Sequence, residues 1–372
     1  MSSTPGFDPD RSADRLGQLV RVETPSAHAP GLERCYQLLA SWSQGLLGTP
    51  ECMVRDGVPH LYWPERSATP DRPPVLLLGH ADTVWACGTL AERPFTVTAG
   101  RATGPGVFDM KAGLVLALDA LELAGGADHV RMLVTGDEEQ GSPTSRELIA
   151  QAAAGCGAVL VLEPSERGAV KTARKGVGLY RLDVQGRASH AGLEPELGVN
   201  ALVELAHQVL AINELGDAEL GTSVTPTVGR AGTTTNSVPE AAHLDVDVRA
   251  WHRRELERVE QALRLLRPRL PGAGLELAGG INRPPLERGM SVRLLEAARR
   301  LAEQHGLAGV EEARVGGGSD GNLTAALGIP TLDGLGPAGG GAHARHEWVD
   351  LDSFAERATL VAGLIRAGAA DR

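Results

Sequence analysis

The sequence is poor in cysteine and in aromatic residues. Its four cysteines, Cys35, Cys52, Cys87 and Cys156, lie far apart in the 372 residues and show no paired spacing. That arrangement favours free thiols, serving as small core residues, in a protein of a reducing compartment. Because aromatic residues make up only 3% of the chain, the core must be built mainly from Leu, Val and Ala.

Long apolar runs are also missing, and positive charge is in deficit. No apolar run approaches the ~20 residues of a membrane-spanning helix, and the polar first ten residues lack the apolar segment of a signal peptide. The 36 basic and 47 acidic residues give a net charge of -11, which disfavours phosphate backbones and anionic membranes as partners. We therefore expect a cytoplasmic protein that binds neither nucleic acid nor membrane.

Three short apolar runs, at 75–78, 130–135 and 158–162, are typical of buried strands. Segments with helical spacing of apolar residues, such as 111–123 and 144–154, separate them. This alternation predicts an α/β fold with a mostly parallel sheet covered by helices. The carboxyl ends of parallel strands share one edge of the sheet, where such folds place their ligands.

The pattern changes after residue 177. Alternating polar and apolar residues, typical of antiparallel strands with one solvated face, occur at 180–184, 223–230 and 242–250. Amphipathic helical segments lie between and after them. We expect an inserted α+β sandwich at 178–287, which divides the α/β domain into a first part at 1–177 and a second part at 288–372.

Each apolar run stops at a potential metal ligand. His80 and Asp82 follow the first, Glu138 and Glu139 the second, and Glu163 the third. A carboxylate placed against a core strand is costly unless it is paired or metal-bound. The adjacent Glu138 and Glu139 leave an extended backbone on opposite sides, so one could bind metal while the other acts as a general base.

Asp109 and His343 complete a set of imidazole and carboxylate ligands. The set suits zinc, with cobalt or manganese as alternatives, and is large enough for two ions ~3.5–4 Å apart. Asp109 follows a glycine-proline turn at the start of a helical segment, which makes it the natural bridging ligand. Taken singly, Asp109 could be a helix cap, and Glu138 and Glu139 an acidic helix start.

In order along the chain, these motifs resemble the landmarks of the M20 zinc peptidases. The matching stretches are HADTV at 80–84, GPGVFDMKAG at 104–113, TGDEEQGS at 135–142 and EP at 163–164. ASHAG at 188–192 resembles the signature of the inserted domain, and GGSD at 317–320 and His343 resemble the C-terminal signatures. The family includes acetylornithine deacetylase, succinyl-diaminopimelate desuccinylase, aminoacylase and glutamate carboxypeptidase.

The resemblance implies two zinc ions per chain. One would be held by His80 and Glu163 and the other by Glu139 and His343, with Asp109 shared. His346, close to His343, remains an alternative ligand.

The resemblance also implies the catalytic groups. Asp82 would orient His80, and Glu138 would take a proton from the bridging water. His190 would reach from the inserted domain of one subunit toward the metals of the other and stabilise the oxyanion. The protein would therefore be a homodimer that associates through its inserted domain.

Segments 195–203, 236–239 and 247–249 are similar to the glutamate carboxypeptidase branch. This similarity implies that Arg249 and Asn236 hold the α-carboxylate of the substrate and that Lys175 adds positive charge. The spacing of His343 and Glu347, in contrast, is that of the deacylases.

The leading hypothesis is a di-zinc amide hydrolase, namely a carboxypeptidase that releases C-terminal glutamate or a similar amino acid from small peptides. The alternative is a deacylase of N-acyl amino acids, and a more distant one is a metal-free binding protein. The glycine runs at 316–318 and 339–341 do not follow the dinucleotide-binding pattern.

Overall fold

The computed structural model describes residues 6–67, 72–125 and 128–368. They form two compact units. The first comprises the described residues within 1–173, 286–315 and 319–372, and the second comprises 174–285 and 316–318. The sequence pattern placed the start of the insertion at residue 178, a few residues later than the start of the second unit. Strand β9 (Gly176–Gln185) begins with three buried residues, so its alternation of buried and exposed residues becomes visible only after them.

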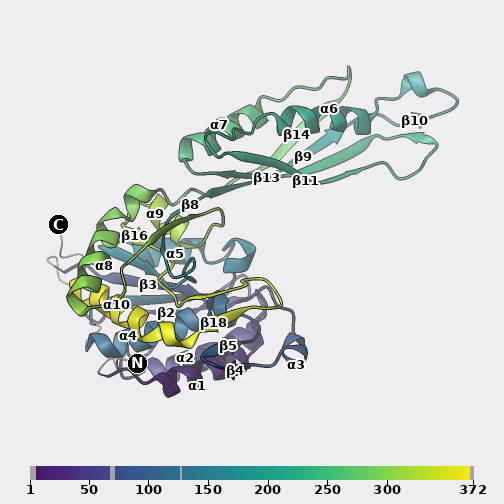
Figure 1. Cartoon of the computed structure of the whole chain (residues 1–372). Coiled ribbons are helices and arrows are strands. Elements are labelled where there is room, and N and C mark those ends of the chain that lie inside the picture. Colours follow the sequence, from purple (N-terminus) through teal and green to yellow (C-terminus); the bar gives the residue numbers. More distant parts are fainter. Residues whose placement is uncertain (1–5, 68–71, 126–127, 369–372) are drawn as a thin grey trace. The chain divides into compact units, whose positions relative to one another are not determined.

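A six-stranded sheet forms the centre of the first unit (Figure 1). Its order is β1 (Glu51–Arg55), β2 (Val58–Trp63), β6 (Val130–Thr135), β3 (Val75–His80), β7 (Ala158–Val161) and β16 (Thr331–Leu332). The last four of these strands are parallel, whereas β2 runs antiparallel to β6 and pairs with β1 as a hairpin. The predicted α/β fold with a mostly parallel sheet is confirmed.

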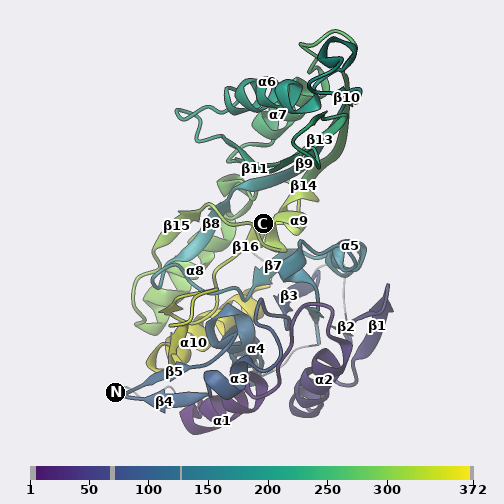
Figure 2. The same ribbon diagram turned by 90° about the vertical axis from the view of Figure 1, so that its right-hand side faces the viewer.

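Helices cover both faces of this sheet (Figures 1 and 2). They are α1 (Pro9–Val20), α2 (Ala29–Ser43), α4 (Ala112–Ala124), α8 (Val292–His305) and α10 (Phe354–Ala367) on one face, and α5 (Arg146–Ala153) and α9 (Gly321–Ala326) on the other. Leu77 of β3 packs in the core of the first group, and its neighbours Leu76 and Leu78 in the core of the second. Burial on both faces explains why β3 reads as an unbroken apolar run.

A small antiparallel sheet joins distant parts of the first unit. Its strands are β17 (Gly339–Gly340), β18 (Trp348–Asp350), β5 (Arg101–Thr103) and β4 (Thr96–Thr98). The pairing of Trp348 with Thr103 brings the loop of His343 beside the turn that leads to Asp109. Two further short strands, β8 (Val170–Arg174) and β15 (Glu312–Val315), pair with each other.

The second unit is a two-layer α+β structure. Its antiparallel sheet has the order β11 (Ser223–Ala231), β13 (Ala241–Ala250), β9 and β14 (Gly274–Arg283). Apolar residues of one sheet face, among them Leu182 and Leu244, pack against α6 (Ala201–Asn213) and α7 (Arg253–Arg264). Among the residues that the structure describes, no helix has the length and apolarity needed to cross a membrane.

Candidate metal centre

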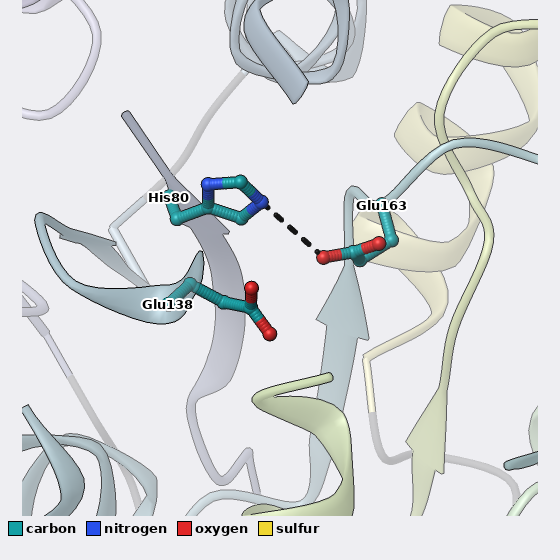
Figure 3. A group of neighbouring side chains, drawn as sticks. All are labelled: His80, Glu138 and Glu163. Atoms are coloured by element: carbon teal, nitrogen blue, oxygen red, sulfur yellow. Dashed lines mark ion pairs between the residues drawn. The ribbon is translucent and has the colours of Figure 1, made fainter. Parts of the chain in front are cut away.

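The first group of candidate ligands lies at the carboxyl ends of three neighbouring parallel strands. His80 is the last residue of β3, Glu138 and Glu139 form the turn after β6, and Glu163 follows β7. Parallel strands end at one edge, so these side chains converge. Figure 3 shows His80, Glu138 and Glu163 pointing toward one another, with candidate ligand atoms all within 4.8 Å.

Asp109 connects two histidines through its two carboxylate oxygens. Its Oδ1 lies 3.3 Å from His80 Nε2, which is also 3.4 Å from Glu163 Oε1. Its Oδ2 lies 3.4 Å from His343 Nε2, which is 3.0 Å from Glu139 Oε2. The arrangement therefore has two neighbouring sets of ligand atoms, one around each imidazole, with Asp109 common to both.

Two atoms of this cluster show that its donors suit a metal ion. His80 Nε2 and Glu139 Oε1 are buried, and within the described part of the chain neither makes a hydrogen bond. Buried polar atoms left in this state normally cost stability. Imidazole nitrogen and carboxylate oxygen are ligands of zinc and of related divalent cations. The residues present therefore fit the divalent metal that the motifs imply.

The close contacts within this cluster shift the pKa values of its members. Burial alone would lower the pKa of His80, but Asp109, Asp82 and Glu163 raise that pKa well above its usual value. Asp109 and Glu139 raise the pKa of His343 to about 10. Burial opposes ionisation of Asp109, yet the two histidines hold its pKa below the ordinary range.

Asp82 has a wider set of contacts than its motif indicates. His80 Nδ1 lies 3.0 Å from the Asp82 carbonyl oxygen and 3.4 Å from its Oδ1. The Asp82 carboxylate accepts the backbone N–H groups of Glu138 and Glu139, at 3.2 and 3.1 Å, and the Ser26 hydroxyl at 2.6 Å. It thus anchors the glutamate turn, while the backbone of the same residue orients the imidazole.

The turn before Asp109 depends on a glycine. Gly106 has φ +69°, and a Cβ at this position would lie 2.3 Å from Thr83 Cγ2. Only glycine combines that conformation with such a close approach. Asp109 itself has an extended backbone, with φ -111° and ψ 98°, and the Asp109–Met110 peptide bond is cis.

Glu347 is a buried residue of this centre that sequence reasoning did not assign to the site. Its carboxylate accepts the backbone N–H groups of Gly106, Phe108 and Asp109, in the turn that leads to and includes Asp109. Its spacing from His343 was the only sequence signal, and spacing alone does not reveal a contact with residues some 240 positions away. In the described ranges His346 makes no ion pair with the cluster, whereas His343 does.

The remaining candidate residues lie in the second unit. His190 is exposed, and its Nδ1 accepts the N–H groups of Gly192 and Leu193, both at 3.1 Å. The proton of the neutral ring therefore lies on Nε2. The backbone carbonyl of Asn236 accepts a hydrogen bond from the backbone N–H of Ala191 at 2.9 Å, which places Asn236 beside the His190 loop.

Arg249 and Lys175 have other neighbours within this unit. Arg249 forms a forked ion pair with Asp247, at 2.8 and 2.9 Å. The Lys175 ammonium lies 5.3 Å from the centroid of the Trp251 ring. Asp247 thus engages the Nε and Nη2 groups of the Arg249 guanidinium.

Comparison with known proteins agrees with the motifs. The model of peptidase family M20/M25/M40 matches residues 76–367. Carboxypeptidase G2 of Pseudomonas sp. is 35% identical over 303 residues, which cover 78% of this chain and 73% of that protein. Acetylornithine deacetylase of Myxococcus xanthus is 29% identical over 250 residues, covering 63% and 65% of the two chains.

A solved structure shows the same fold. An M20-family metallo-carboxypeptidase of Sulfolobus solfataricus superposes with a TM-score of 0.72 at 18% identity, covering 97% of this chain and 99% of that one. The resemblance inferred from the motifs is thus confirmed. The chain belongs to peptidase family M20/M25/M40 and is a metallohydrolase of that family.

Proposed function

We propose that the protein is a di-zinc carboxypeptidase that releases C-terminal glutamate, or a similar amino acid, from small peptides. The observation that carries this proposal is the contact of Asp109 with His80 through one oxygen and with His343 through the other. One ion would be held by His80 and Glu163, the other by Glu139 and His343, and Asp109 would be shared. Cobalt or manganese could replace zinc.

The protein groups around the centre suit hydrolysis of an amide. Zinc ions held there would supply a water of lowered pKa, about 7, and would polarise the scissile carbonyl. Glu138 lies beside His80 and Glu163, where its carboxylate takes a proton from the attacking water and gives it to the leaving amine. His190 Nε2–H donates a hydrogen bond to the developing oxyanion.

Substrate recognition is assigned to cationic and amide groups of the second unit. Arg249 offers a planar guanidinium to the α-carboxylate of the substrate. Asn236 donates through its amide, and Lys175 adds positive charge. Such groups counter the acidity of the chain, whose net charge is -11.

A deacylase of N-acyl amino acids is the second candidate. It is favoured by the spacing of His343 and Glu347 and by the similarity to acetylornithine deacetylase. Hydrolysis of dipeptides with C-terminal glutamate and of N-acetylornithine, each with zinc, cobalt or manganese added, separates the two functions. Preference for the glutamate compounds supports the carboxypeptidase, and preference for N-acetylornithine overturns it.

Metal content separates both enzymes from a metal-free binding protein. The proposal expects two zinc ions per chain after purification in zinc-containing buffer, measured by elemental analysis. Less than one ion per chain, with no hydrolysis of any substrate, would favour the binding protein.

We also propose that the protein forms a homodimer through its second unit. Strand β11 is at the edge of its sheet, and edge strands invite pairing with another chain. The adjacent helix α6 exposes Leu202, Val203 and Leu210 on one face, with Leu210 67% exposed. An apolar face beside an open strand edge fits a second copy of the chain, and light scattering measures the oligomeric state.

A further inference from the structure

We propose that Glu347 is a positioning residue that holds Asp109 between the two histidines of the metal centre. The inference rests on the proposed metal function but concerns a residue outside the ligand set. Glu347 is 1% exposed. Four N–H groups donate to its two carboxylate oxygens, three of them from the backbone that leads to Asp109.

The Glu347 carboxylate accepts hydrogen bonds from three backbone N–H groups of the turn and from one side chain. Oε1 accepts the N–H of Phe108 at 2.9 Å and that of Asp109 at 3.0 Å. Oε2 accepts the N–H of Gly106 at 2.9 Å and the indole N–H of Trp85 at 3.0 Å. A carboxylate is stable in a buried position only when hydrogen-bond donors surround its oxygens. The four donors therefore hold the Glu347 carboxylate in place, and the carboxylate in turn holds the backbone of the turn.

Asp109 needs this external support because regular helix begins only after it. Helix α4 starts at Ala112, and Asp109 lies in an extended conformation before it. The side chain of Asp109 must nevertheless direct Oδ1 to His80 and Oδ2 to His343. A rotation of this backbone would move both oxygens together and would disturb both sets of ligand atoms.

Glu347 also ties together the segments that carry the histidines. Trp85 lies in the loop that leaves β3 after His80, and the Arg93 guanidinium stacks on its ring at 4.2 Å from the centroid. Glu347 itself lies four residues after His343, and its N–H donates to the Ala344 carbonyl at 3.0 Å. One carboxylate, carried by the loop of His343, therefore contacts both the turn of Asp109 and the loop that follows His80.

The second unit offers a matched control. Glu204 is also fully buried, and its carboxylate accepts the backbone N–H groups of Arg269 and Leu270 at 2.7 to 3.0 Å. It does not belong to the metal centre. Glu204→Gln therefore removes the same kind of carboxylate-to-backbone contact without touching the turn of Asp109.

The test is a cobalt titration of the metal-free full-length chain, followed by visible absorption. Glu347→Gln should weaken cobalt binding about 10–100-fold, as loss of an outer contact of a metal ligand commonly does, and should change the absorption of the bound cobalt. Glu204→Gln should keep the wild-type affinity and spectrum, even where its melting temperature falls. Trp85→Phe, which removes one donor and leaves the backbone contacts, should cause a smaller loss of affinity.

A Glu347→Gln protein that binds cobalt with wild-type affinity and spectrum would overturn the inference, whatever its stability. If Glu347→Gln does not fold, Trp85→Phe and Glu347→Asp decide, and wild-type binding in both would overturn it equally. The proposed hydrolysis is tested separately. If the wild type binds cobalt but cleaves no substrate, the activity fails and the role of Glu347 stands; if it binds no cobalt, both fail.

Discussion

Two histidines of the centre have pKa values that make metal binding compete with protons. The pKa of His343 is raised to about 10 by Asp109 and Glu139, and that of His80 is also raised. The His343 imidazole therefore carries a proton at pH 6 to 8 when no metal is bound, and metal ligation must displace that proton. We predict that zinc affinity rises with pH over this range.

Calorimetry in buffers of different ionisation enthalpy counts the protons released as zinc binds. His343→Ala should release fewer protons than the wild type, whereas His305→Ala, at the distant end of α8, should release as many as the wild type. Binding that is independent of pH, with no net proton release, would contradict this protonation scheme.

Glu138 and its neighbour Glu139 have different predicted roles. Glu138→Gln should retain the metal and lower kcat by about 10²–10⁴-fold, because a general base is removed and no ligand is lost. Glu139→Gln should instead lose metal, since Glu139 lies 3.0 Å from His343. Gln140→Ala, at the exposed end of the same turn, is the control for both. Near-full turnover of Glu138→Gln would exclude Glu138 from proton transfer.

Some residues of the site could be predicted and others could not. His80 and Glu163 are visible in the sequence because each ends or follows an apolar strand whose burial makes a polar group costly. Asp82 and Glu347 accept most of their hydrogen bonds from backbone N–H groups, which every residue except proline carries. The sequence therefore does not indicate which backbone N–H groups donate to these two carboxylates.

At the level of elements, the turn before α4 depends on Gly106. Gly106→Ala combines a left-handed backbone with a contact of 2.3 Å to Thr83. We predict a loss of about 2–4 kcal/mol in the free energy of unfolding, together with weaker metal binding, measured by urea denaturation and elemental analysis. Gly306→Ala shares the positive φ, at +64°, but has open space, and should cost only about 1 kcal/mol. Equal losses in the two variants would show that the close approach to Thr83 does not matter.

Elements with a strong pattern were predicted well, and short elements were not. The run at 130–135 coincides with β6, and the helical pattern at 111–123 lies within one residue of α4 at either end. Strands β4, β5, β17 and β18 span two or three residues each, too few for a periodic pattern. The pairing of β5 with β18 joins segments almost 250 residues apart, and such pairing depends on the packing of the whole unit.

At the scale of the whole molecule, the proposed dimer predicts complementation between subunits. Glu138→Gln and His190→Ala dimers should each be nearly inactive. If His190 serves the partner subunit, mixed dimers contain one site with both an intact Glu138 and an intact His190. Activity should then reappear when the two variants are dissociated, mixed and allowed to reassociate, as measured by hydrolysis of a glutamate substrate.

The control for this mixture is a double variant that carries both substitutions. Mixing it with either single variant provides no site with both groups intact, so no activity should appear. Absence of recovery in the first mixture, with mixed dimers verified by mass spectrometry, would place His190 in its own subunit's site or remove it from the reaction.

The sequence by itself determined the family, the α/β sheet and the five candidate ligands. Apolar runs that end in acids and imidazoles are local features, and the edge of a parallel sheet gathers them by geometry. Only the tertiary structure decided that the oxygens of Asp109 face different histidines, and that Glu347 holds the turn between them. These contacts join segments that are far apart in the chain, and their geometry is set by packing and by backbone donors common to nearly all residues.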